Sequence, residues 1–433
     1  MILTGCLLLF SLLVIIIGKK TNDSLLAPNR IIPLMWVLLI IIPCIFWNTN
    51  YAWNGKGLFW LMLAMISMEL GGIVCGDKKI RCRNPILPLE FEDRVFNSDS
   101  ELDKGRVMEI LVLILILLGL FGVVGQMYLA GYSINNFLSF ESWVKMNEEV
   151  AYNRYYGETE TSIFTQLLIS FEYLAALAGG YAFNFSKRKK HKLLCIATFF
   201  PIVLNMFYAN TKSGFISNII LWFSGWCISR IWLTGGLPRI TPKMLILALT
   251  GFLVFSIIMI LVMVLRTGDF SSEMFLNRID EFFVYAFGGT AGFDYWFTNG
   301  TDLNNYDMGA NTYMSISKYI GYSKLDNYEN FFKGLGNIYT AFRGVIMDFG
   351  KVGGLIFCFL RGFVSQITFN SVAAGDSYPF LSMSVLMCMY FWGIYSFLIS
   401  SWRYTSYIIL IVFFVIFLFV FHKKVLDVLQ YHK

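Results

Sequence analysis

Apolar runs of about twenty residues recur from one end of the chain to the other, and they limit the fold more than any other feature. As an α-helix, a run of this length crosses the hydrocarbon core of a bilayer. The chain is 57% hydrophobic and only 14% charged, whereas soluble domains are nearer half apolar and a quarter charged. The sequence therefore predicts an all-α polytopic membrane protein.

About eleven of these runs are expected to be transmembrane helices. The predicted spans cover residues 2–17, 31–47, 58–74, 107–130, 163–185, 193–208, 215–233, 244–265, 352–369, 379–400 and 404–421. Residues 1–265 would carry transmembrane helices 1–8, residues 266–351 one long external loop with amphipathic helices, and residues 352–433 helices 9–11. The first run lacks a signal-peptide cleavage pattern, so we interpret it as a retained helix.

Lysine and arginine residues are distributed unequally between the two sides of this topology. The rich side collects the basic residues of segments 19–30, 78–106, 187–192, 230–243 and 423–433. Its excess over the short loops of the other side is about fourfold, and such loops stay in the cytoplasm. We expect a cytoplasmic C-terminus, with the N-terminus and residues 266–351 outside. The same topology accounts for the net charge of +6, so nucleic acid is not an expected partner.

Residue types for metal, disulfide or nucleotide chemistry are not grouped in the sequence. All cysteines except Cys82 fall within or at the edge of apolar runs, and the three histidines stand beside lysines at span ends. No nucleotide-binding P-loop occurs. We expect no metal site, no disulfide framework and no cofactor.

The predicted external loop begins with a helix signal. Ser271 precedes an apolar stripe at helical spacing over residues 274–286, which favours an amphipathic helix along the membrane surface. Gly288, Gly289 and Gly292 are expected to loosen the backbone after it. Aromatic residues interleaved with amides and carboxylates follow up to residue 333, and this mixture suits sugar rings. An interfacial aromatic belt is the alternative.

A polar, glycine-bearing segment, residues 335–354, meets a predicted span and is the strongest candidate for a site. It carries Asn337, Tyr339, Thr340, Arg343 and Asp348. Ionisable side chains at such depth are costly unless they are paired or face a wet cavity. A loop re-entering the bilayer is the alternative. Glu69 and Glu172, inside other spans, are either functional or helix-packing residues on the same argument.

Several external cations could converge on a diphosphate, because guanidinium groups match phosphate oxygens. The candidates are Lys212, Arg266, Arg278, Arg343 and Arg403. Each alone could instead anchor a span end. A carboxylate could take a proton from an attacking sugar hydroxyl. Asp280 and Asp348 are the preferred candidates, because each lies within five residues of Arg278 or Arg343.

Two segments carry a resemblance to a known family. Asn337-x-Tyr339-Thr340-x-Phe342 followed by Asp348-Phe349-Gly350 and Gly353 resembles the Wzy-type O-antigen and capsular repeat-unit polymerases. Tyr285-x-x-Gly288-Gly289 with Phe293, and the turn Thr211-Lys212-Ser213-Gly214, are similar to further family elements. Arg278 with Gly289, and Arg343 with Gly354, match the family's Arg-x10-Gly spacing. Here both fall in one outer segment, whereas the family has them in two.

This resemblance implies a metal-independent glycosyltransferase with a membrane fold of the GT-C kind, acting in lipopolysaccharide or capsule biosynthesis. It implies a bacterial inner-membrane location with the active site facing the periplasm. The donor would be a glycan on undecaprenyl diphosphate and the acceptor a second lipid-linked repeat unit. A flippase and a chain-length-regulating membrane protein would be partners.

The implied catalytic residues are Arg278, Arg343, Asp280 and Asp348. The expected glycan-binding residues are Asn337, Tyr339, Thr340, Tyr285 and Trp296. A lipid-linked oligosaccharide flippase is the main alternative, although transporters tend to show internal repeats and short loops. An O-antigen ligase is a second alternative, but by family resemblance it needs an external histidine.

Overall fold

The computed structural model describes residues 2–22, 24–46, 53–76, 100–156, 163–185, 188–209, 212–265, 271–300, 306–321, 340–375 and 379–430. These residues contain helices, short 3-10 turns and connecting segments, and no β-strand. Within them, eight helices are long and apolar enough to cross a membrane. The chain is therefore a polytopic helical membrane protein, as its apolar runs predict.

The eight spans are formed by α2 (Pro28–Phe46), α3 (Lys56–Cys75), α5 (Ser100–Leu129), α7 (Ile163–Ala182), α8 (Lys189–Ala197) with α9 (Phe200–Ala209), α10 (Lys212–Thr234), α11 (Pro242–Leu265) and α14 (Ala341–Ala373). Three shorter apolar helices lie within α1 (Ile2–Gly18), α15 (Phe380–Tyr395) and α16 (Thr405–Gln430). Every predicted span is thus helical, wholly or in its larger part. The span predicted at 193–208 is two helices, because Pro201 has no N–H to donate and stands in the first turn of α9.

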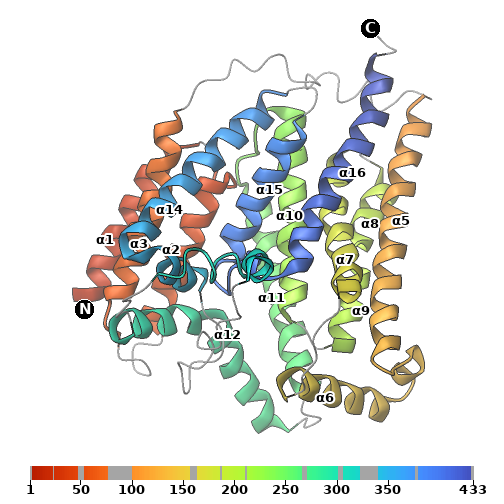
Figure 1. The fold of residues 1–433 in the computed structure, drawn as a ribbon, viewed down its shortest axis with the longest axis horizontal. Coiled ribbons are helices and arrows are strands. Elements are labelled where there is room, and N and C mark those ends of the chain that lie inside the picture. Colours follow the sequence, from red (N-terminus) through yellow and green to blue (C-terminus); the bar gives the residue numbers. More distant parts are fainter. Residues whose placement is uncertain are drawn as a thin grey trace.

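The long helices stand side by side, and two other helices cross their ends (Figure 1). These are α6 (Phe140–Tyr156) and α12 (Ser272–Asn299), both at the lower edge of the view. The start of α1 lies at the same edge and the end of α16 at the opposite one (Figure 1). The face bearing α6 and α12 is called the α12 face below.

Helix α12 confirms one expectation and corrects another. It begins as predicted, with the Ser271 side chain accepting a hydrogen bond from the Met274 N–H. The predicted loosening at Gly288, Gly289 and Gly292 is wrong, since the helix continues to Asn299. These glycines are buried, and packing within the bundle offsets the helix-propensity cost of about 1 kcal/mol for each glycine.

Buried side chains form two large apolar clusters. One joins α5, α7, α10, α15 and α16, and the other joins α1, α2, α3, the end of α12 and the start of α14. Helix α14 contributes to both clusters and so connects the two halves. Helix α11 differs from its neighbours: 11% of its span residues are buried, against 67% in α10. It meets other helices mainly near its C-terminal end, where Met259 and Val262 pack beside Met206 of α9.

Glycines let α3 and α14 approach until their backbones touch. A Cβ added at Gly362 of α14 would lie 1.8 Å from the Met68 carbonyl oxygen of α3. One added at Gly71 of α3 would lie 2.0 Å from the Phe359 carbonyl oxygen of α14. Small residues at such crossings permit close packing of helices in lipid, where no hydrophobic force draws helices together.

We expect Gly362→Ala to separate α3 from α14 and to lower the free energy of unfolding by about 1–3 kcal/mol, as overpacking does. Thermal unfolding in detergent measures this loss. Gly251→Ala on α11 is the matched control, because nothing lies within 4 Å of a Cβ added there. Equal melting temperatures of the two variants would contradict the close approach.

Candidate functional site

The candidate site is built around a break in α14. Gly350 has φ 75° and ψ 174°, which are not helical, so residues 341–349 form a separate first part of α14. Two independent features of the structure exclude a side chain at position 350. Its φ lies in the left-handed region, and an added Cβ would lie 2.8 Å from the Tyr306 hydroxyl. The first part of α14 folds back toward the second, since Val345 lies beside Gly354.

A short outer segment, residues 306–313, covers the end of this first part. The Asp307 N–H donates to the Met347 carbonyl, which the break leaves without a helical partner. Asp348 is 1% exposed and accepts hydrogen bonds from the Asn311 N–H at 2.9 Å and the Thr312 N–H at 2.6 Å. The Asn311 side-chain amide donates to it as well, at 3.0 Å. Both oxygens of Asp348 therefore hold the outer segment in place.

Asp307 stands beside Asp348 and is more accessible. The side-chain nitrogen of Asn311 donates to Asp307 Oδ2 at 2.8 Å and to Asp348 Oδ1 at 3.0 Å. The two carboxylates thus share one amide donor. Asp307 is half-buried while Asp348 is buried, so Asp307 is the carboxylate of the pair that a ligand can approach.

Arg343 lies on the same first part of α14 and is 3% exposed. Its guanidinium carbon is 5.3 Å from the ring centroid of Trp296 on α12. Trp296 is 3% exposed, so its ring positions the arginine and presents little surface to a sugar. Thr340 is the buried N-cap residue of α14, and the following Ala341 N–H donates to the Ser396 carbonyl at 2.8 Å.

Aromatic side chains fix the first part of α14 within the bundle. The ring centroid of Phe342 lies 5.0 Å from that of Trp36, 6.0 Å from Trp60 and 5.8 Å from Trp392. The Trp60 indole N–H donates to the Lys351 carbonyl at 3.0 Å, just past the break. These contacts hold the first part of α14, and with it the backbone of Arg343, in a fixed position within the bundle.

Asp294 holds the other end of α12 onto the bundle. It is 1% exposed and accepts three backbone N–H bonds at the start of α3, from Asn54, Gly55 and Gly57, at 2.8–2.9 Å. A carboxylate at this position satisfies N–H groups that a helix start leaves without partners and complements the helix dipole. Gly57 is required here, since an added Cβ would lie 2.7 Å from the Asp294 Cα.

The other predicted site residues lie elsewhere on the α12 face. Arg278 pairs with Glu281, and Asp280 beside them is exposed. Eighteen residues separate Arg278 from Trp296, about 27 Å along a helix, so the structure does not bring Arg278 and Arg343 together.

Lys212 lies over the ring of Tyr285, at 4.6 Å from its centroid. Arg403 is half-buried in the turn Ser401–Arg403, next to the outer segment. The predicted residues Arg266, Asn337 and Tyr339 lie outside the described residues.

Arg361, in the second part of α14, is a functional candidate that the sequence analysis did not single out. It is 7% exposed, its guanidinium carbon is 3.9 Å from the ring centroid of Trp392, and its Nη2 donates to the Met389 carbonyl at 3.1 Å. No carboxylate among the described residues forms an ion pair with it. A desolvated cation–π contact contributes about 2 kcal/mol, less than the several kcal/mol that burying an ion costs.

Arg361 is electrostatically connected to the outer segment. Burial raises the pKa of the Tyr313 hydroxyl, while the positive charge of Arg361 opposes this rise and the negative charge of Asp348 adds to it. Hydrogen bonds also link Trp392, which covers Arg361, to the outer segment. The Trp392 indole donates to Ser400 Oγ at 3.1 Å, and Ser400 Oγ donates to the Thr312 carbonyl at 2.8 Å.

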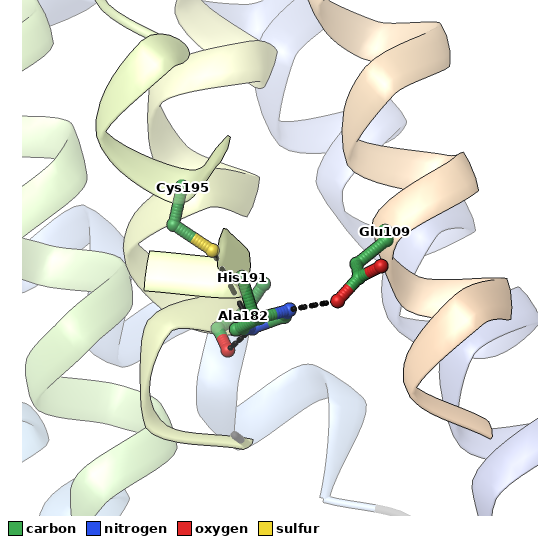
Figure 2. Close-up of polar contacts among 4 residues, drawn as sticks. All are labelled: Glu109, Ala182, His191 and Cys195. Carbon is green, nitrogen blue, oxygen red and sulfur yellow. Dashed lines mark hydrogen bonds and ion pairs between the residues drawn. The ribbon is translucent and has the colours of Figure 1, made fainter. Parts of the chain in front are cut away.

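A second cluster of titratable groups lies near the opposite face, between α5, α7 and α8. Figure 2 shows His191 with Nε2 at 2.9 Å from the Ala182 carbonyl and Nδ1 at 3.8 Å from Glu109 Oε1. A carbonyl only accepts, so Nε2 carries the proton and cannot take one from Cys195, whose sulfur is 3.5 Å away. The cluster is therefore not an activated thiol, and it joins three helices.

Helix packing also accounts for Glu172. Its carboxylate accepts from the side-chain amides of Gln126 at 3.1 Å and Asn205 at 2.8 Å. Glu69 is 1% exposed and lies beside Gly18, close to Arg30. Within the described ranges, no group of three His, Cys, Asp or Glu side chains could hold a metal ion.

Of Arg361 and Asp294, only Arg361 carried a signal in the sequence. Arg361 is an ionisable residue within an apolar run, the criterion that pointed to Glu69 and Glu172. Asp294 stands among aromatic residues of a predicted loop, where nothing in the sequence marks a helix-capping role. No family model, curated protein or solved structure shows significant similarity to this chain.

We expect Asp294→Ala to release the end of α12 from α3 and to cost roughly 3 kcal/mol, since three backbone N–H groups, two of them buried, lose a charged acceptor. Hydrogen exchange of the backbone amides at residues 54–57 should become faster, and the melting temperature should fall. Asp280→Ala, on an exposed position of the same helix, should change neither. Unchanged hydrogen exchange in the Asp294 variant would contradict the role of Asp294 in holding α12 onto α3.

Proposed function

We propose that this chain is a membrane-embedded glycosyltransferase that polymerises lipid-linked oligosaccharide repeat units, as its resemblance to the Wzy-type O-antigen and capsular polymerases implies. The observation that carries the proposal is the arrangement at the broken start of α14. A buried guanidinium, that of Arg343, and an accessible carboxylate, that of Asp307, are held on one short helix segment and its cover.

The wider architecture agrees with this proposal. The eight long spans and three shorter apolar helices correspond to the eleven helices predicted from the sequence. In the proposal they form a GT-C-like fold in a bacterial inner membrane. The N-terminus and the α12 face are periplasmic, and the C-terminus is cytoplasmic. Undecaprenyl-diphosphate-linked glycans would then approach Arg343 from the outer leaflet.

The reaction requires few groups from the protein. The acceptor hydroxyl oxygen forms a bond to the anomeric carbon of the donor glycan, and the bond from that carbon to the diphosphate oxygen breaks. Negative charge grows on the leaving lipid diphosphate, and a preorganised cation such as Arg343 stabilises it. The hydroxyl proton passes to a carboxylate. Binding two lipid-anchored substrates side by side at this site accelerates the reaction through proximity.

Asp307 is the proton acceptor in this proposal, and Asp348 positions it. Both oxygens of Asp348 are engaged by donors from residues 311 and 312, whereas Asp307 is half-buried and receives one amide bond from Asn311. Arg278 and Asp280 stand at the far end of α12, so we assign them no part in the reaction at Arg343.

Loss of Arg343 should stop polymerisation without removing the protein from the membrane. In a host deleted for this gene and complemented with Arg343→Ala, surface glycan should collapse from long chains to single repeat units. Removing one such electrostatic contact lowers rates by about 10²–10³-fold. Gel analysis of the glycan shows the change, and Arg343→Lys should keep part of the long chains.

Arg239→Ala, on an exposed residue outside the α12 face, is the control and should keep full-length glycan. The same gels separate this function from a flippase. Without a flippase, single units would also disappear from the surface. Long chains in the Arg343→Ala strain would defeat the site assignment, and loss of single units would favour transport.

Asp307→Asn should lower the elongation rate by about 10²–10⁴-fold, as loss of a general base does, while the fold remains intact. Asp348→Asn should instead lower the melting temperature, because it weakens charged hydrogen bonds to the outer segment. The two effects are measured by elongation of lipid-linked units with purified protein and by thermal unfolding. Full activity of Asp307→Asn would rule out this base.

A further inference from the structure

Arg361 is a buried cation that the proposed transfer reaction does not use. Gly362 beside it lies against Met68 of α3, twelve residues into a helix that begins at Lys56, so this level is about 18 Å from the start of α3. The guanidinium is therefore near the middle of the spans. Arginine does not lose its proton in proteins, so the charge must be compensated there.

The contacts of Arg361 compensate it only in part. Trp392 covers one face of the guanidinium plane, and Nη2 donates to the Met389 carbonyl. Nε is buried and has no hydrogen-bond partner among the described residues. Ser365, one turn further along the same face of α14, is fully buried, and its hydroxyl is likewise without a partner. Two buried donors, carried by residues one helical turn apart, are thus left without partners, and one of them belongs to the cation.

These donors define the chemistry of a ligand. Because Trp392 occupies one face of the guanidinium, a ligand bound between the helices would meet its Nε edge in the plane of the group. An in-plane approach to a guanidinium edge is how oxyanions bind, with oxygens accepting from adjacent N–H groups. The hydroxyl of Ser365 can donate to a further oxygen. A negative charge there would also supply the missing counter-ion.

We propose that Arg361 and Ser365 form a binding site for a phosphate-class oxyanion between α14 and α15. The site is distinct from Arg343, which lies on the other side of the Gly350 break. Its nearest connection to the α12 face is through Tyr313 and Trp392, which join it to the outer segment. The proposal stands whether or not the chain is a transferase.

The direction in which the melting temperature changes in the variant Arg361→Met tests this site. Arg361→Met keeps the apolar length of the side chain and removes the uncompensated charge. In full-length protein purified in a phosphate-free maltoside detergent, this variant should melt at the same temperature as the parent protein or higher, since replacing a poorly compensated buried ion with an apolar side chain is neutral or stabilising. A lower melting temperature would show that the protein itself satisfies Arg361, and would overturn the proposal.

An added oxyanion should raise the melting temperature of the parent protein above that of Arg361→Met. Inorganic pyrophosphate or farnesyl diphosphate should raise the melting temperature of the parent protein by about 2–4 °C. Measured in an Arg343→Ala background, so that the proposed transfer site does not contribute, the rise should be absent in Arg361→Met, reduced in Ser365→Ala and retained in Arg239→Met, the exposed control. A rise with both probes identifies a site open to free oxyanions, and a rise with farnesyl diphosphate alone identifies a lipid-borne phosphate. No rise with either probe, or an equal rise in Arg361→Met, would overturn the proposal.

Discussion

Two buried carboxylates hold the outer segments onto the spans, and the geometry of the α12 face depends on them. Asp348 accepts the N–H groups of residues 311 and 312, and Asp294 accepts those of residues 54, 55 and 57. Each carboxylate replaces water as the partner of backbone groups that no helix can satisfy. The position of α12 on α3, and of the outer segment on α14, follows from these bonds.

The break at Gly350 explains why such bonds are needed. A continuous α14 would satisfy its own carbonyls, whereas the broken helix leaves a helix end inside the bundle. The Asp307 N–H meets the Met347 carbonyl there. The chain thereby gains a short helix segment, residues 341–349, that carries both Arg343 and Asp348. That segment gives the candidate site its fixed geometry.

The sequence predicts the spans well because their signal is local. A run of apolar residues long enough to cross lipid needs no knowledge of its neighbours. The uninterrupted course of α12 through three glycines was not predictable in this way, since it depends on what packs against residues 288–292. Helix α6 also lacks a strong signal of its own, and the Trp143 indole and Asn147 amide dock it onto the Phe207 carbonyl.

The candidate site was predictable where its residues are neighbours in the chain. Arg343 and Asp348 share one helix segment, as the spacing predicts. The expected meeting of Arg343 with Arg278 depended on how residues 272–299 fold, and a long helix holds the two ends of that segment apart. Arg361 looks in the sequence like a single charge in an apolar run. Only the structure shows that its companions are an indole and a carbonyl, and that no carboxylate of the described residues pairs with it.

Gly350 also has a consequence for how this gene can vary. Every amino acid reachable from a glycine codon by one nucleotide change carries a β-carbon. At this position a β-carbon meets both an unfavourable φ of 75° and the ring of Tyr306. The codon is therefore free to drift only at its silent third base.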